Sequence, residues 1–134
     1  MPNRNGDSGD NNLDYRGETN DPPGNWPTGQ AYYNIQALGG NDTVYGTKWS
    51  DWIDGGDGND RLYGFNGDDT LLGGAGSDSL YGGDGNDYFE GGIGADVLWG
   101  ENGNDWMVGG DGGDQLERFL TRLNHNGIPV AAIF

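Results

Sequence analysis

The sequence has no cysteine, few basic residues and no long apolar run. Without cysteine, neither a disulfide framework nor a thiolate metal site is possible. Only 6 Lys and Arg residues stand against 22 acidic ones, for a formal net charge of −16. Such a surface repels nucleic acids and anionic membranes, because both are polyanions. We therefore predict no nucleic-acid partner, and we predict no transmembrane segment because no apolar run approaches about 18 residues.

Two further shortages narrow the class of protein. Apolar residues make up 32% of the chain and Gly accounts for 29 of 134 residues, which excludes a large conventional core. The single histidine, His125, has no partnered nucleophile in a recognisable motif, so we predict that the protein is not an enzyme. The N-terminus lacks the apolar stretch of a cleaved signal peptide, so any export would follow another route.

A nine-residue repeat organises residues 37–117. These residues fill nine rows without an insertion, and each row is named here by its first residue number. Gly occupies the first position in eight rows and the fourth position in eight rows. The sixth position is always aspartate: Asp42, Asp51, Asp60, Asp69, Asp78, Asp87, Asp96, Asp105 and Asp114. The eighth position is always apolar: Val44, Ile53, Leu62, Leu71, Leu80, Phe89, Leu98, Met107 and Leu116.

This pattern, Gly-Gly-x-Gly-x-Asp-x-U-x with U apolar, resembles the RTX (repeats-in-toxin) family of hemolysin-type calcium-binding β-roll proteins. The cleanest row runs from Gly55 to Tyr63, and the resemblance covers 81 of 134 residues. It implies an all-β fold, a right-handed parallel β-roll (solenoid) of nine rows with two rows per coil. We expect short caps to flank the roll.

The residues support this fold independently. Positions seven to nine suit a three-residue strand, in which position eight faces one side and its neighbours face the other. Positions one to six suit a turn, since Gly adopts backbone conformations closed to other residues. Two rows then make a coil of 18 residues, and the position-eight side chains meet in a thin core.

Alternate turns of such a roll stack on the same side, which brings aspartates together one coil apart. One stack would hold five aspartates (Asp42 to Asp114) and the other four (Asp51 to Asp105). Like charges so placed repel, and a hard cation that accepts carboxylates and carbonyls, as Ca²⁺ does, removes the repulsion. Four gaps and three gaps give up to seven Ca²⁺ ions. Their +14 charge nearly cancels the net −15 of residues 37–117.

The predicted calcium ligands are the nine sixth-position aspartates together with turn residues at the first, third and fourth positions. The turn residues are Gly55, Asp57, Gly58, Gly64, Asn66, Gly67, Gly73, Ala75, Gly76, Gly82, Asp84, Gly85, Gly91, Ile93, Gly94, Gly100, Asn102, Gly103, Gly109 and Asp111. Rows 37 and 46 depart from the pattern, with Leu38 in the second position of one and Trp49 in the fourth position of the other. Calcium sites built on these two rows are in question.

The flanks divide the chain into three segments. Residues 1–30 form a polar N-terminal arm, for which a disordered tail and an arm docked on the roll both remain open. Residues 31–117 form the roll, including a calcium-free first strand at 31–36 in which Tyr33 replaces the aspartate. Residues 118–134 form a C-terminal cap, either a helix or a hairpin, whose apolar end resembles type I secretion signals.

Aromatic residues recur at the ninth position in one set of alternate rows: Tyr45, Tyr63, Tyr81 and Trp99. We expect a ladder of rings up one face, which either stabilises the sheet or binds a sugar ring or another copy. The function we favour is an extracellular calcium-binding structural protein. It would be secreted, fold on calcium binding and self-associate as a homopolymer in a filament or matrix at the cell surface. The alternatives are a C-terminal secretion and folding module of a larger RTX enzyme, and an adhesin module that binds polysaccharide.

Overall fold

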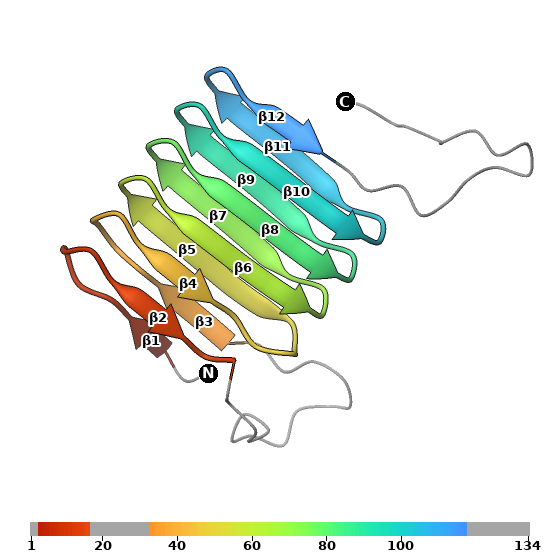
Figure 1. Cartoon of the computed structure of the whole chain (residues 1–134), viewed down its shortest axis with the longest axis horizontal. Helices are drawn as coiled ribbons and strands as arrows, with labels where there is room; N and C mark the ends of the chain where they lie inside the picture. The colour runs from red at the N-terminus through yellow and green to blue at the C-terminus, as the bar shows by residue number, and fades with distance from the viewer. Residues whose placement is uncertain (1–2, 17–32, 118–134) are drawn as a thin grey trace, which may run out of the picture.

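The computed structural model describes residues 3–16 and 33–117, and in this part of the chain every regular element is a β-strand. Figure 1 shows the strands stacked in order from the N-terminal end to the C-terminal end of a roll. The strands are β1 (Asn3–Asn5), β2 (Asn12–Asp14), β3 (Tyr33–Gln36), β4 (Thr43–Tyr45), β5 (Asp51–Asp57), β6 (Arg61–Asn66), β7 (Thr70–Ala75), β8 (Ser79–Asp84), β9 (Tyr88–Ile93), β10 (Val97–Asn102), β11 (Trp106–Asp111) and β12 (Gln115–Glu117).

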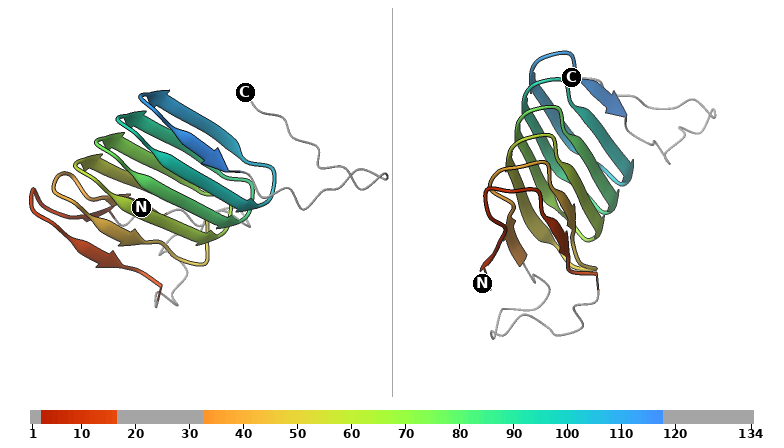
Figure 2. Two further views of the ribbon diagram at one scale, coloured as in Figure 1. Left: turned by 45° about the horizontal axis from the view of Figure 1, so that its top comes forward. Right: turned by 60° about the vertical axis from the view of Figure 1, so that its left-hand side comes forward.

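The strands form two six-stranded sheets in which every pair is parallel. One sheet has the order β1-β3-β5-β7-β9-β11, and the other has the order β12-β10-β8-β6-β4-β2. Within the repeat the register advances by 18 residues, so that Leu62 pairs with Leu80 and Leu80 with Leu98. Two rows therefore make one coil, and the predicted all-β parallel β-roll is confirmed (Figure 2).

The strands are longer than the three residues expected from the repeat. β6, for example, runs from position seven of one row to position three of the next. The second-position glycines continue the ladder, as in the pairing of Gly56 with Gly74. The turn proper is thus limited to positions four to six, which places the aspartate directly before the next strand.

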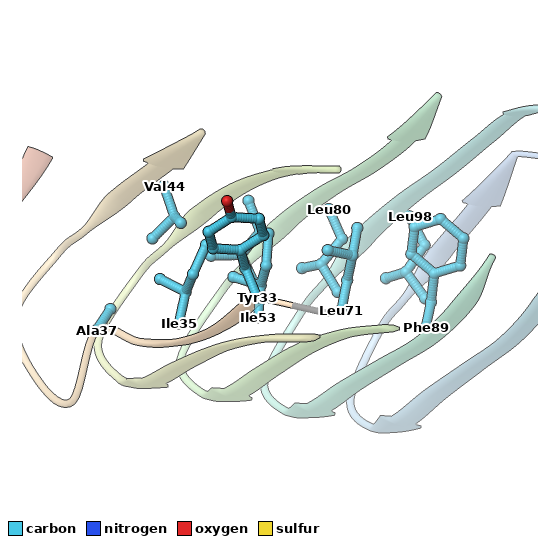
Figure 3. Packing of buried hydrophobic residues seen from close by; sticks show 10 residues of the cluster. Tyr33, Ile35, Ala37, Val44, Ile53, Leu71, Leu80, Phe89 and Leu98 are labelled. Carbon is cyan, nitrogen blue, oxygen red and sulfur yellow. The ribbon is translucent and has the colours of Figure 1, made fainter. Parts of the chain in front are cut away.

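The core consists of the eighth-position side chains, as predicted. Ile53, Leu71 and Phe89 of one sheet meet Leu80 and Leu98 of the other in a single file between the sheets (Figure 3). All five are completely buried. The core becomes exposed to solvent in the last coil, where Met107 is only partly buried and Leu116 is 39% exposed.

Part of the segment expected to form a polar arm belongs to the roll. β1 pairs with β3, and β2 pairs with β4, so these residues add one coil before the predicted start. Strand β3 exists as predicted and buries Ile35, but it lies between β1 and β5 instead of at the edge of its sheet. Here Leu13 pairs with Val44 over an offset of 31 residues instead of 18, so the 18-residue spacing of the repeat does not predict this coil.

The predictions for residues 118–134, a cap and a secretion signal, lie outside the described residues. Among the residues that the structure describes, no helix is long and apolar enough to cross a membrane.

Candidate calcium sites

The sixth-position aspartates are stacked in two columns, and those from Asp42 to Asp105 are buried. In each column one carboxylate oxygen accepts a hydrogen bond from the backbone N–H of the aspartate one coil earlier. The Asp60 N–H donates to Asp78 Oδ1 at 2.8 Å, and the Asp78 N–H donates to Asp96 Oδ1 at 2.9 Å. Asp114 ends its column, is half-buried and accepts from the Asp96 N–H at 3.0 Å.

The second carboxylate oxygen of most of these residues has no hydrogen-bond partner although it is fully buried. This applies to Oδ2 of Asp42, Asp60, Asp69, Asp78, Asp87 and Asp96. Burying a polar oxygen without a partner costs about 1–3 kcal/mol, and more for a charged group. The repetition of such oxygens from turn to turn indicates that they are ligands for a cation.

The glycines of the turn bring backbone close to these oxygens. A Cβ atom added to Gly73 would lie 2.5 Å from Asp78 Oδ2, and one added to Gly91 would lie 2.5 Å from Asp96 Oδ2. Second and fourth positions take positive φ angles, 107° at Gly74 for example, which favour glycine. The turn therefore surrounds each carboxylate with backbone and leaves no room for a side chain.

Burial sets the electrostatics of the two columns. It raises the pKa of Asp69 to about 9, with further contributions from the neighbouring carboxylates of Asp51 and Asp87. Burial likewise raises the pKa of Asp78 to about 7 and that of Asp60 to about 6. The calcium-free columns therefore hold protons at pH values where free aspartate is ionised, and a divalent cation offers a stronger source of positive charge.

The other predicted ligands are backbone carbonyls. Those at the third position already accept hydrogen bonds from backbone N–H groups of the neighbouring coil. The Gly58 N–H donates to the Ala75 carbonyl and the Gly76 N–H to the Ile93 carbonyl, both at 2.7 Å. A carbonyl oxygen has a second lone pair, so this bond leaves one acceptor position. Within residues 3–16 and 33–117 no group of three or more His, Cys, Asp or Glu side chains is placed to hold a metal. The fit to calcium thus rests on pairs of carboxylates with carbonyl oxygens, a mixture that Ca²⁺ accepts.

Rows 37 and 46, which depart from the repeat, behave differently from each other. In row 37, Leu38 takes the second-position conformation with a φ of 81°, and Asp42 is buried like the other aspartates. In row 46, Thr47 donates its N–H to Asp51 Oδ2 at 2.6 Å, and its hydroxyl lies 3.1 Å from both carboxylate oxygens. The sequence placed the calcium sites of both rows in question. In the structure row 37 keeps the turn conformation of the repeat, whereas row 46 does not.

A second ladder of hydrogen bonds, which the sequence analysis missed, runs beside each column. The Asn59 N–H donates to Asn41 Oδ1 at 2.9 Å, and the Ser77 N–H donates to Asn59 Oδ1 at 2.8 Å. On the other column the Asn86 N–H donates to Asp68 Oδ1 at 2.8 Å. The sequence contains a pattern that predicts this ladder, because seven of the nine fifth positions are Asn, Asp or Ser, whose side-chain oxygens accept hydrogen bonds.

The predicted aromatic ladder is confirmed. Ring centroids are 5.0 Å apart for Tyr45 and Tyr63, 4.7 Å for Tyr63 and Tyr81, and 4.5 Å for Tyr81 and Trp99. The Arg16 guanidinium lies 4.4 Å from the Tyr45 ring centroid at the N-terminal end of the ladder. The ring faces thus stack on one another along the sheet.

Comparison with known families agrees with this geometry. The family described as RTX calcium-binding nonapeptide repeat matches four segments, residues 34–48, 49–80, 63–98 and 81–116. Together they span more than half of the 134 residues. No curated protein and no solved structure gives a significant match. The chain belongs to the RTX calcium-binding nonapeptide repeat family.

Proposed function

We propose that the protein is an extracellular structural protein whose roll folds when calcium fills the gaps between stacked turns. The observation that carries this proposal is the repeated, buried and unpartnered Oδ2 atom of the aspartate columns. Calcium supplies the positive charge that these oxygens lack. Because a site made from two turns exists only in the folded chain, the free energy of binding adds directly to that of folding.

The two columns offer up to seven gaps between successive aspartates. A central aspartate such as Asp78 borders two gaps, whereas Asp114 borders one among the described turns. Magnesium suits these gaps less well, because it demands a tight octahedron of ligands and loses its water reluctantly.

Far-ultraviolet circular dichroism tests the coupling between calcium and folding. In excess chelator at neutral pH we expect a coil-like spectrum, and millimolar calcium should produce β-structure. Magnesium at the same concentration is the control and should leave the chain largely unfolded. A β-rich spectrum in chelator at neutral pH would show that the columns need no cation and would refute the proposal.

We also propose self-association of the calcium-bound roll, end to end. Among the described strands, β11 and β12 each have an unpaired edge, and so do β1 and β2 at the other end (Figure 1). Open strand edges pair readily with other chains. The last coil also exposes Trp106 at 65% and Leu116 at 39%. A head-to-tail contact of this type repeats into a filament or a matrix.

Calcium concentration supports an extracellular site of action. Extracellular calcium modules bind at about 10⁻⁴–10⁻³ M, so the chain would stay unfolded inside a cell and fold after export. RTX repeat proteins are generally secreted, in agreement with this order of events. The aspartates serve the turns, and we propose no enzymatic activity for the chain.

Light scattering and electron microscopy with and without calcium test the self-association. We expect growth into polymers in millimolar calcium and monomers in chelator. A calcium-bound protein that stays monomeric at high concentration contradicts the structural role. A secretion and folding module or a polysaccharide-binding adhesin would then be the better account, although the ring faces of the aromatic ladder are already occupied by one another.

A further inference from the structure

The first described turn of each aspartate column differs from all those that follow. One is the turn of Gly6–Asn11, with Asn11 in the sixth position, and the other is the turn of row 46. In the remaining rows the second and fourth positions take positive φ angles, such as 97° at Gly56 and 134° at Gly58. Within the described residues this conformation is absent from both first turns, at Asp7 and Gly9 as well as in row 46.

In the Gly6–Asn11 turn the amide of Asn11 lies among the oxygens of two successive turns. Asn11 Nδ2 donates to the carbonyl oxygen of Gly9 and lies 3.4 Å from that of Asp7. It also lies 3.1 Å from Asp42 Oδ1 in the next turn of the column, where the Asn11 backbone N–H donates at 2.6 Å. The amide of Asn11 therefore occupies the space between the carbonyl oxygens of its own turn and Asp42 Oδ1, to which it adds a second donor, while Asp42 Oδ2 stays without a partner.

In row 46 the hydroxyl of Thr47 has the corresponding role. It lies 3.1 Å from both oxygens of Asp51 and 3.4 Å from the carbonyl oxygen of Trp49. The backbone N–H of Thr47 donates to Asp51 Oδ2, so this oxygen is satisfied. A β-branched residue also disfavours positive φ, which keeps the turn from adopting the conformation of the others.

We propose that Asn11 and Thr47 take the place of calcium in the first described turn of each column, so that the N-terminal part of the roll closes without metal. This inference rests on the calcium-binding function proposed above and specifies where it stops. The gap between Asn11 and Asp42 takes no ion, and the gap that begins at Asp51 takes none either. The wild-type roll then binds at most six ions, four in one column and two in the other.

Equilibrium dialysis followed by atomic absorption, which counts calcium per chain at saturation, tests this proposal. Asn11→Asp restores a carboxylate of the same size and should add one bound ion. Thr47→Gly removes the hydroxyl from both oxygens of Asp51 and lets the second position take the positive φ of the other turns, so it should also add one ion. The controls are Asn11→Ala and Thr47→Ser, neither of which should change the count.

The calcium concentration at half-folding separates the contribution of the Asn11 amide to stability from its effect on the number of bound ions. Asn11→Ala removes the amide without adding a ligand, so the count stays unchanged while the calcium concentration at half-folding rises. An Asn11→Asp or Thr47→Gly chain that folds in saturating calcium with the wild-type number of ions overturns the proposal. An Asn11→Asp chain that cannot fold in saturating calcium overturns it as well, since the new carboxylate should gain a cation. A wild-type chain that binds no calcium is a different outcome and refutes the calcium-binding function itself.

Discussion

Replacing Asp78 by asparagine removes one carboxylate shared by two calcium gaps. Asp78 lies between Asp60 and Asp96 in its column; its Oδ1 accepts from the Asp60 N–H, and its own N–H donates to Asp96 Oδ1. Asparagine keeps the size of the side chain and the Oδ1 acceptor, so the ladder bond to the Asp60 N–H persists. Only the charge and the second ligand oxygen are lost. Asp114→Asn is the matched control, because Asp114 borders one gap among the described turns.

The magnitude follows from the number of gaps that each carboxylate borders. A ligand present at 100 times its dissociation constant stabilises the folded state by about 2.7 kcal/mol per site. If each substitution abolishes binding in the gaps it borders, Asp78→Asn lowers the free energy of unfolding by about 5 kcal/mol and Asp114→Asn by about 3 kcal/mol. In chelator at acid pH, where we expect the calcium-free roll to fold, Asp78→Asn should not destabilise it, since a protonated carboxyl is replaced by a neutral amide.

Chemical unfolding in urea, followed by circular dichroism at fixed free calcium, measures both losses. The same titration repeated at several calcium concentrations shows whether the loss scales with calcium, as binding requires. Equal losses for the two variants would mean that the gaps are not shared between successive turns. A loss of the same size in chelator at acid pH would mean that Asp78 stabilises the roll through contacts unrelated to the ion.

Three further predictions concern the calcium-free columns, the core and the ring ladder. Burial raises the pKa of Asp69 to about 9 and that of Asp51 to about 7, from 3.8. Because these carboxyl groups stay protonated in the folded chain, the calcium-free roll is most stable below about pH 4, and this stability is lost as pH rises through the pKa values of the folded state. A pH titration in chelator, followed by circular dichroism, should therefore show β-structure only on the acid side. β-structure that grows with pH would contradict the prediction. Leu80→Ala in the core should cost about 2–5 kcal/mol in urea unfolding with calcium, and a loss below 1 kcal/mol would indicate a loose core. Tyr81→Leu should cost about 1–3 kcal/mol more than Tyr88→Leu, because Tyr81 stacks on two rings at about 0.5–1.5 kcal/mol each and Tyr88 lies 37% exposed on the other sheet. Equal losses in the same assay would show that ring stacking adds nothing.

The parallel roll, its 18-residue coil and its core were predictable, because each depends on spacing alone. An apolar residue at the eighth position of every row, such as Leu62 and Leu80, fixes which face is buried and which strands pair. The first coil was not predictable in this way. Its register to β4 spans 31 residues, and its sixth position is Asn11 instead of aspartate.

The site was predictable in part, for a related reason. The nine-residue spacing identifies which carboxylates stack, but it does not tell which oxygens remain without a partner. That distinction depends on φ angles and on single donors. Leu38 adopts the glycine-like conformation despite its side chain, whereas Thr47 does not and bonds to Asp51 instead.

The constant 18-residue register makes the length of this molecule adjustable in discrete steps. Each coil pairs only with the coils before and after it, so the energetics are close to those of a one-dimensional array. Removing residues 73–90 would join row 64 to row 91 with every inward position still matched. Duplicating them would lengthen the roll by about 4.8 Å, one strand spacing. A gene that gains or loses such units by recombination would thus change the reach of its product without redesigning a single contact.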